Sequence, residues 1–234
     1  MAGTDPKIVA LVPMRHSSER VEGKNYRPLG GKPLFHHIVD TLRSVPEVSE
    51  IVIDTDSPLI GEDVAESFPE VRVLERPEHL LGGDVPMTDV LAHDVSVVEA
   101  DLYLQTHSTN PLLKPATVQA GLRAFLDAGD AYDSLFSVTP LHTRLWSPAG
   151  EPLNHDPNVL LRTQDLPPVM EENSCLYLFE GDLLERTGRR IGERPLLFPI
   201  EGDEASDIDE ESDWRVVEAL YDYMHGRDTQ GELA

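Results

Sequence analysis

Cysteine is nearly absent from this 234-residue sequence. The one present, Cys175, allows neither an internal disulfide nor a metal site built from several cysteines. It lies in the apolar run 175–179, which predicts a buried strand residue rather than a reactive thiol. Long hydrophobic runs are lacking too, since no stretch approaches the roughly 18 apolar residues that span a bilayer. No signal peptide opens the sequence, so we expect a cytoplasmic protein.

Positive charge is also scarce. The sequence holds 19 Lys and Arg against 43 Asp and Glu, which gives a formal net charge of −24. Such a surface repels nucleic acids and anionic membranes, so we expect neither as a partner. A local cluster of cations in this chain is therefore informative, because it runs against the overall charge.

Short apolar runs alternate with longer amphipathic stretches along most of the chain. We predict buried strands over 8–12, 51–53, 71–74, 102–104 and 135–138, and helices over 34–43, 59–68, 88–99 and 115–128. This alternation is typical of a doubly wound, mostly parallel α/β sheet of Rossmann-like type, here as a single domain over 1–234. Ligands of such sheets bind beyond the carboxyl ends of the strands. We therefore expect the site in the loops after Val12, Ile53 and Leu104.

The strand–helix rhythm stops in the segment 140–172, which is rich in Pro, His, Asn and Arg. A structureless loop of this length is improbable inside a compact domain, so we predict a small β-type arm inserted there. The arm carries apolar side chains that it cannot bury alone, namely Leu145, Trp146, Leu153, Val159 and Leu160. We therefore expect it to pair two subunits in a homodimer and to contact substrate. A last helix is expected over 213–223, with Ser212 as its N-cap.

Four cations, Arg15, Arg20, Lys24 and Arg27, lie within thirteen residues after the first predicted strand. Such a loop suits a triphosphate, because backbone N–H groups and positive charges neutralise the anion. The spacing of a Walker phosphate-binding loop is absent. Composition alone also allows a solvated basic turn.

The same segment resembles the opening of the acylneuraminate cytidylyltransferases, the CMP-sialic acid synthetases. Lys24 follows Arg15 by nine positions, as in that family, and Gly-Lys-Pro-Leu follows at 31–34. Ser17 stands where a glycine is usual and Glu19 where a lysine is usual, which makes Arg20 the candidate for that phosphate contact. The resemblance implies substrate contacts from Arg15, Ser18, Arg20, Lys24 and Asn25.

Two further loops resemble the same family. Residues 76–84 are similar to its Arg-Pro-x-x-Leu-Ala-x-Asp loop, which implies that Asp84 lies on the nucleotide side, although a plain turn is equally compatible. Residues 105–112 resemble Gln-Pro-Thr-Ser-Pro-Leu. Aligned on the proline, His107 takes the place of the substrate-reading Gln, so Gln105 and His107 are both candidates. A structural role for His107 stays open.

Residues 162–174 resemble the family's Arg-x-Gln-Asp-Leu-Pro-Pro…Glu-Asn-Gly stretch, which lines the sugar side. The resemblance implies that Arg162 makes a bidentate contact with a sugar carboxylate. It also implies that Gln164 and Asn173 hydrogen-bond sugar hydroxyl groups. Without the resemblance, the segment is interpreted as a proline-stiffened connector.

The acidic stretch 206–214 resembles the family's closing motif. Alternate residues of a strand share a face, so Asp207 and Asp209 are predicted to present their carboxylates together. Paired carboxylate oxygens suit a hydrated Mg²⁺ that also binds phosphate. In so acidic a chain, a solvated loop is the alternative.

The resemblance covers roughly residues 7–224. It implies a Mg²⁺-dependent reaction of CTP with a sialic-acid-like, nine-carbon 2-keto sugar acid, which yields the CMP-sugar and pyrophosphate. Arg15 and Lys24 would hold the triphosphate, and Asp209 would act with them in catalysis. Two alternatives stay open: a sister nucleotidyltransferase for an eight-carbon ulosonic acid or another sugar, and an α/β nucleotide-binding protein without turnover.

Overall fold

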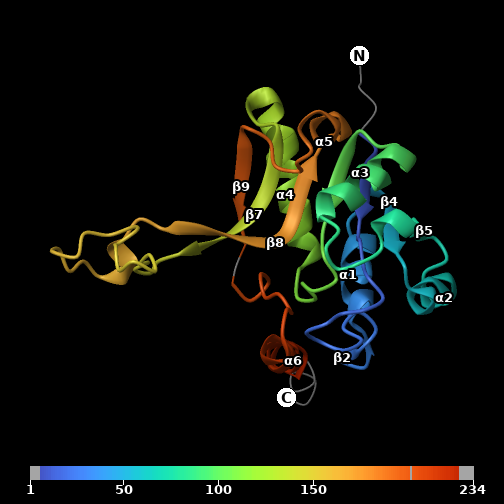
Figure 1. Ribbon diagram of the computed structural model, residues 1–234, viewed down its shortest axis with the longest axis horizontal. Helices are drawn as coiled ribbons and strands as arrows, with labels where there is room; N and C mark the ends of the chain where they lie inside the picture. The colour runs from blue at the N-terminus through green and yellow to red at the C-terminus, as the bar shows by residue number, and fades with distance from the viewer. Residues whose placement is uncertain (1–5, 201, 227–234) are drawn as a thin grey trace, which may run out of the picture.

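The computed structural model describes residues 6–200 and 202–226, which form an α/β sandwich around one large sheet (Figure 1). Within those residues the sheet has seven strands in the order β5-β4-β1-β6-β8-β7-β9. Its strands are β1 (Ile8–Leu11), β4 (Val48–Thr55), β5 (Arg72–Glu75), β6 (Leu102–Gln105), β7 (Ser134–Leu141), β8 (Val169–Phe179) and β9 (Pro195–Pro199). A short hairpin pairs β2 (Pro28–Leu29) with β3 (Lys32–Pro33). The main helices are α1 (Leu34–Arg43), α2 (Pro58–Ser67), α3 (Met87–Val97), α4 (Pro115–Ala128), α5 (Gly181–Thr187) and α6 (Glu211–Gly226).

The sheet is mostly parallel, as predicted. Strand β1 pairs in parallel with β4 and β6, β4 with β5, and β7 with β9. Strand β8 is the exception, because it runs antiparallel to both β6 and β7. The helices predicted over 34–43 and 115–128 are confirmed at both ends, whereas the other predicted elements shift by a few residues. The sequence interpretation missed α5 and β9.

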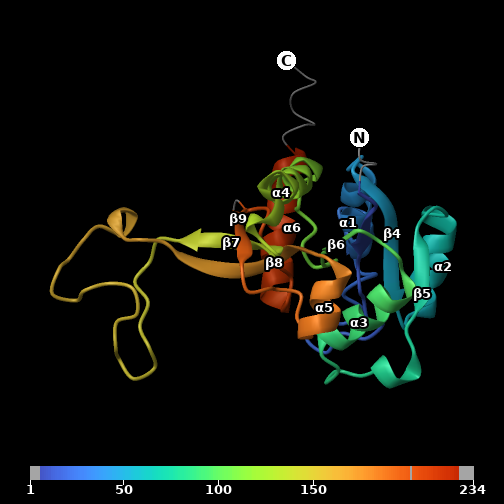
Figure 2. The same ribbon diagram turned by 90° about the horizontal axis from the view of Figure 1, so that it is seen from above.

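Strand β1 shows why its sequence is a continuous apolar run. Ile8 and Ala10 pack into the core under α1, α2 and α4, whereas Val9 and Leu11 pack into a second core under α3 and α5. Figure 2 shows α4 on one face of the sheet and α3 and α5 on the other. A central strand covered on both faces needs apolar side chains at every position. Cys175 is fully buried in the first core, as expected.

A third apolar cluster lies beside the sheet and attaches α6 to the segment after β1. It joins Val21 and Leu29 to Trp214 and Val217, all of them buried. Helix α6 begins at Glu211, so Ser212 lies in its first turn and the prediction that it caps the helix is wrong. Asp213, the third residue of the helix, instead fixes the segment before it, because its Oδ2 accepts the backbone N–H groups of Asp209 and Glu210 at 3.0 and 2.8 Å.

Residues 142–168 project far from the sheet beyond the ends of β7 and β8 (Figures 1 and 2). The two strands stay paired out to Leu141 and Val169, which gives the projection a β-type base. Beyond that base the structure has a single isolated bridge, between Trp146 and Pro152, and one short 3₁₀ turn over Thr163–Asp165. We call residues 142–168 the arm. Among the described residues, no helix combines the length and the apolar character needed to cross a membrane.

Candidate functional site

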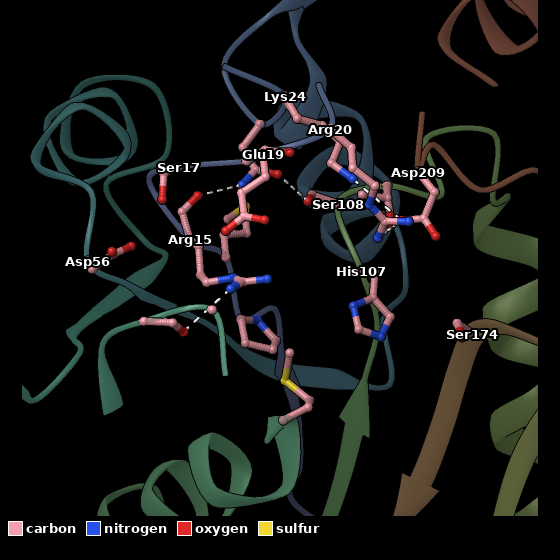
Figure 3. A pocket seen from close by; sticks show the side chains of 18 of the residues that line it. Arg15, Ser17, Glu19, Arg20, Lys24, Asp56, His107, Ser108, Ser174 and Asp209 are labelled. Carbon is pink, nitrogen blue, oxygen red and sulfur yellow. Dashed lines mark hydrogen bonds and ion pairs between the residues drawn. The ribbon is translucent and has the colours of Figure 1, made fainter. Parts of the chain in front are cut away.

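A cavity of about 440 Å³ lies beyond the carboxyl ends of β1, β4 and β6. We call it the pocket. Its walls come from the loop 13–25 after β1, from Asp56 after β4 and from 107–109 after β6, which are the three loops predicted from the strand pattern. The segment 82–84 and the carboxylates Asp207 and Asp209 form further parts of the wall. Figure 3 shows side chains from all of these sides converging on one space.

Arg15, Arg20 and Lys24 supply the positive side of the pocket. Arg20 Nη2 lies 3.1 Å from Asp209 Oδ1 (Figure 3), and Lys24 Nζ donates to the carbonyl of Ile208 at 2.7 Å. Burial lowers the pKa of Lys24, and nearby Asp209 and Asp207 oppose that shift. The three cations therefore lie where an anion of several charges could bind, at one edge of a strongly acidic protein.

Asn25 ties the cation-bearing loop to the loop after β6. Its Nδ2 donates to the carbonyl of Arg15 at 2.8 Å, and its Oδ1 accepts from Ser108 Oγ at 2.6 Å. Gly23 has a φ of +62°, a conformation that glycine adopts without strain, and it turns the chain between Arg20 and Asn25. Ser18 lies on the pocket wall as well. Asn25 therefore positions the cations, and it also lines the pocket itself.

Asp207 and Asp209 supply the negative side. The segment that carries them forms no strand, so that part of the prediction is wrong. The alternation still holds, because Ile208 is fully buried against Trp214 while both carboxylates line the pocket. Burial, followed by the charge of Asp209, raises the pKa of Asp207, although a hydrogen bond from Thr109 opposes the shift.

These two carboxylates fit a hydrated divalent cation. Asp207 Oδ1 is buried without a hydrogen-bond partner among the described residues, and an unpaired buried oxygen is costly unless a ligand satisfies it. No group of three or more His, Cys, Asp or Glu residues in that part of the chain could hold a metal. Mg²⁺ is commonly held by one or two carboxylates, with water and substrate phosphates as its other ligands. The donor set therefore fits Mg²⁺ better than a metal that needs an all-protein site.

Of the two candidates Gln105 and His107, only His107 lines the pocket. His107 lies on the pocket wall, whereas Gln105 is fully buried behind it, with its Nε2 at 2.9 Å from His107 Nε2. Burial and the nearby cations Arg190 and Lys24 lower the pKa of His107 to about 3, so the ring is neutral at physiological pH.

Asp84 and the two glycines before it line the opposite wall. A Cβ at Gly83 would lie 3.5 Å from Glu19 and 3.6 Å from Arg15, so the loop approaches the cations closely. Arg76, at the start of this loop, is buried and forms an ion pair with Asp54, while its Nη2 donates to the carbonyl of Met14 at 3.4 Å. It therefore fixes the end of β1 beneath the pocket.

Three predicted sugar-side residues lie apart from the pocket of their own chain. Arg162 and Gln164 are exposed on the arm, where Arg162 makes a bidentate pair with Asp165 at 2.7 and 3.0 Å. Asn173 is buried and connects β8 to β7, because its Oδ1 accepts from Ser137 Oγ at 2.5 Å and its Nδ2 donates to Thr139 at 3.0 Å. None of the three lines the pocket.

Sequence reasoning missed a group of polar residues beside His107. Ser174 lines the pocket, and Tyr177 hydrogen-bonds both Glu172 at 2.5 Å and Ser174 at 3.2 Å. The guanidinium of Arg190 lies 3.5 Å from the centre of the Tyr177 ring. No motif marks Arg190, which reaches this place from the loop after α5.

Comparison with known proteins agrees with this architecture. The chain is 29% identical over 234 residues to the CMP-N,N'-diacetyllegionaminic acid synthase of Legionella pneumophila, with 92% of this chain and 96% of that protein covered. It is 30% identical over 121 residues to the 3-deoxy-manno-octulosonate cytidylyltransferase of Escherichia coli. That second match covers 52% of this chain, which spans about half the length of this relative and of the others like it.

Among solved structures, a CMP:2-keto-3-deoxy-manno-octonic acid synthetase complexed with CTP superposes with a TM-score of 0.66 at 19% identity, over 92% of this chain and 98% of that one. A 4-diphosphocytidyl-2C-methyl-D-erythritol synthase superposes with a TM-score of 0.63 at 19% identity, over 92% and 99%. These likenesses show the nucleotide-diphospho-sugar transferase fold. The model of the cytidylyltransferase family matches residues 9–197, which is most of the chain and includes the loops of the pocket up to residue 174. The chain belongs to the cytidylyltransferase family.

Proposed function

We propose that this protein transfers CMP from CTP to a sialic-acid-like nonulosonic acid in a Mg²⁺-dependent reaction that releases pyrophosphate. The observation that carries the proposal is that three cations and two carboxylates line one pocket at the carboxyl ends of the strands, with Arg20 and Lys24 at 3.1 and 3.7 Å from Asp209. A triphosphate with its metal needs that combination, because the cations neutralise the phosphates while the carboxylates bind the metal. Family membership supports the nucleotidyl-transfer chemistry.

The reaction is an in-line displacement at the α-phosphorus. The anomeric hydroxyl oxygen of the sugar acid forms the new bond to phosphorus and gives up its proton to solvent water. The bond to the oxygen that bridges to the β-phosphate breaks, so that pyrophosphate leaves. Arg15, Arg20 and Lys24 hold the phosphates and offset the charge that develops on the leaving group. Asp207 and Asp209 would hold Mg²⁺, which supplies further charge neutralisation there. The chain's contribution is then mostly positioning.

We further propose that the arm pairs two subunits. Four apolar side chains on it are strongly exposed: Trp146 at 51%, Leu153 at 64%, Val159 at 51% and Leu160 at 89%. A second copy could cover these side chains. Arg162 and Gln164 do not line the pocket of their own chain, and pairing would place them beside the sugar acid bound to the partner subunit. Because the chain carries a net charge of −24, the dimer should tighten as ionic strength rises.

An eight-carbon ulosonic acid is the second candidate for the sugar. The relatives that match about half of this chain are named for 3-deoxy-manno-octulosonate, whereas the relative named for a legionaminic acid is matched almost from end to end. The fuller match favours the nine-carbon class. A homologue that binds nucleotide without turnover is the remaining alternative.

Pyrophosphate release separates these candidates. The purified protein is incubated with CTP and Mg²⁺ and with one acid at a time from a panel of nine-carbon nonulosonic acids and eight-carbon ulosonic acids. We expect release with at least one nine-carbon acid and much less with the eight-carbon acids. The reverse order would reassign the sugar, and CTP binding without release from any acid would support the silent homologue.

A further inference from the structure

A buried polar network lies behind His107, and its members Gln105 and Arg190 do not line the pocket themselves. Gln105 ends β6 and is fully buried, and Arg190 reaches it from the loop after α5. Arg190 Nη1 donates to Gln105 Oε1 at 2.5 Å, while the guanidinium lies over the ring of Tyr177. The arginine side chain is 18% exposed, so this contact is largely shielded from water.

The network fixes the orientation of the Gln105 amide. A guanidinium has only N–H donors, so it must meet the carbonyl oxygen of Gln105 and not its amino group. The amino nitrogen Nε2 then faces His107 at 2.9 Å and the carbonyl of Thr106 at 3.3 Å. All the hydrogen-bonding groups of the buried amide are used in this orientation, and reversing it would set two donors against each other.

The amide orientation in turn decides which nitrogen of His107 carries hydrogen. The amino group of Gln105 can only donate, so His107 Nε2 must accept and cannot be protonated. In a neutral ring the hydrogen then lies on Nδ1. Burial and the charges of Arg190 and Lys24 keep the ring neutral. The carboxylate of the network, Glu172, is engaged by Tyr177 at 2.5 Å and by Arg190 at 3.7 Å.

The Nδ1 side of the ring is available to a ligand. No hydrogen bond found among residues 6–200 and 202–226 involves His107 Nδ1, and the side chain lines the pocket. In Figure 3 the imidazole of His107 is seen between Arg15 and Ser174, where it faces the pocket. We propose that Arg190 and Gln105 are positioning residues that lock His107 in the Nδ1–H form, as a fixed donor to an acceptor oxygen of the bound substrate. The identity of that substrate rests on the proposed function.

The test uses the full-length protein labelled with ¹⁵N at histidine, with the His107 signals assigned from their loss in His107→Asn. In the wild type we expect a protonated Nδ1, an unprotonated Nε2 and no titration of this ring between pH 6 and 8. Gln105→Glu keeps the shape of the side chain but replaces its only donor with an acceptor, so hydrogen should move onto Nε2. Arg190→Met frees the amide to rotate and should give a mixture of the two neutral forms.

Arg189→Met is the matched control, since it removes the same charge from the neighbouring exposed position and should leave the His107 spectrum unchanged. Each variant's thermal unfolding is recorded, and if Arg190→Met does not fold, Gln105→Glu decides alone. A wild-type ring with hydrogen on Nε2, a ring that titrates near pH 7, or an unchanged spectrum in Gln105→Glu would overturn the tautomer lock.

The source of the acceptor oxygen is tested by adding CTP with Mg²⁺, or a nonulosonic acid, separately. A shift of the Nδ1 signal with one of them identifies the nucleotide or the sugar acid as the acceptor. No shift with either, or with both together, would overturn the donor role. These spectra need no turnover, so a failure of pyrophosphate release would count against the proposed function and leave the tautomer lock to be judged on its own result.

Discussion

Replacing Asp94 with Asn should change how the stability of this protein depends on pH. Asp94 is fully buried on α3, where it faces Asp54, and Asp54 is itself ion-paired with Arg76. Both oxygens of Asp94 and the Oδ2 of Asp54 lack a conventional partner among the described residues. Burial together with the charge of Asp54 raises the pKa of Asp94 to about 8, so we expect Asp94 to hold a proton and to share it with Asp54, which would pair one oxygen of each carboxyl group.

The sign and size of the effect follow from that shared proton. In the unfolded chain Asp94 releases its proton near the ordinary aspartate pKa of 3.8, whereas the folded protein keeps it until about pH 8. The stability that this group contributes is complete below the unfolded value and falls as pH rises through that window. One proton corresponds to about 1.4 kcal/mol per pH unit, so the folded protein should lose roughly 3 kcal/mol between pH 5 and 7 through Asp94.

The amide introduced by Asp94→Asn cannot titrate, and its amino group can donate to Asp54 in place of the shared proton. The free energy of unfolding is measured with urea at several pH values between 5 and 8 for the wild type, for Asp94→Asn and for the control Asp127→Asn, which changes an exposed carboxylate on α4. We expect the difference between Asp94→Asn and the wild type to grow in favour of the variant as pH rises, while the control stays parallel to the wild type. A difference that is constant across this range would refute the shared proton.

The other predictions concern the proposed activity. Asp209→Asn should fold normally but lose at least about 100-fold in turnover, because metal-assisted charge stabilisation is worth several kcal/mol; near-native turnover at limiting Mg²⁺ would contradict this role. Lys24→Ala should raise the CTP requirement, whereas Arg162→Ala should act mainly on the sugar acid, and kinetics with each substrate varied in turn would show whether both affect CTP alone. Leu160→Asp should shift the protein from dimer to monomer in light scattering across a salt series, and a wild type that stays a fully active monomer of about 26 kDa would contradict pairing through the arm.

The sequence predicted a helix well where it carried both a residue that favours the first turn and a regular spacing of apolar residues. Helix α4 begins at Pro115, whose fixed φ and missing N–H suit a first turn, and the apolar spacing to Phe125 marks its buried face. The direction of β8 could not be predicted in this way. Its apolar residues 175–179 indicate a buried strand, but the choice between parallel and antiparallel pairing depends on how the chain returns through the arm.

The site was partly predictable for a similar reason. Arg15, Lys24, Asp207 and Asp209 meet in the pocket because their loops all follow strand ends or pack against α6. The motif resemblance placed Arg162 in the same pocket, whereas the structure places it on the arm. The spacing of a motif along the chain does not show how far a segment projects from the sheet. Arg190 gave no sequence signal, because its contact with Gln105 spans 85 positions and depends on the fold alone.

The separate apolar cluster under α6 has a consequence for how the site opens. Val21 and Leu29 belong to the cation-bearing side, and Ile208 and Trp214 to the carboxylate side, yet all of them pack together and apart from the two sheet cores. If α6 detached, the cation-bearing side and the carboxylate side of the pocket would therefore both lose their packing while the sheet stayed folded. We expect the cation-bearing loop, the carboxylate segment and α6 to unfold together as one local unit. Their amide hydrogens should exchange with solvent as a group, ahead of those in β1 and β6, and a ligand that bridges the two walls should slow that exchange in both segments equally.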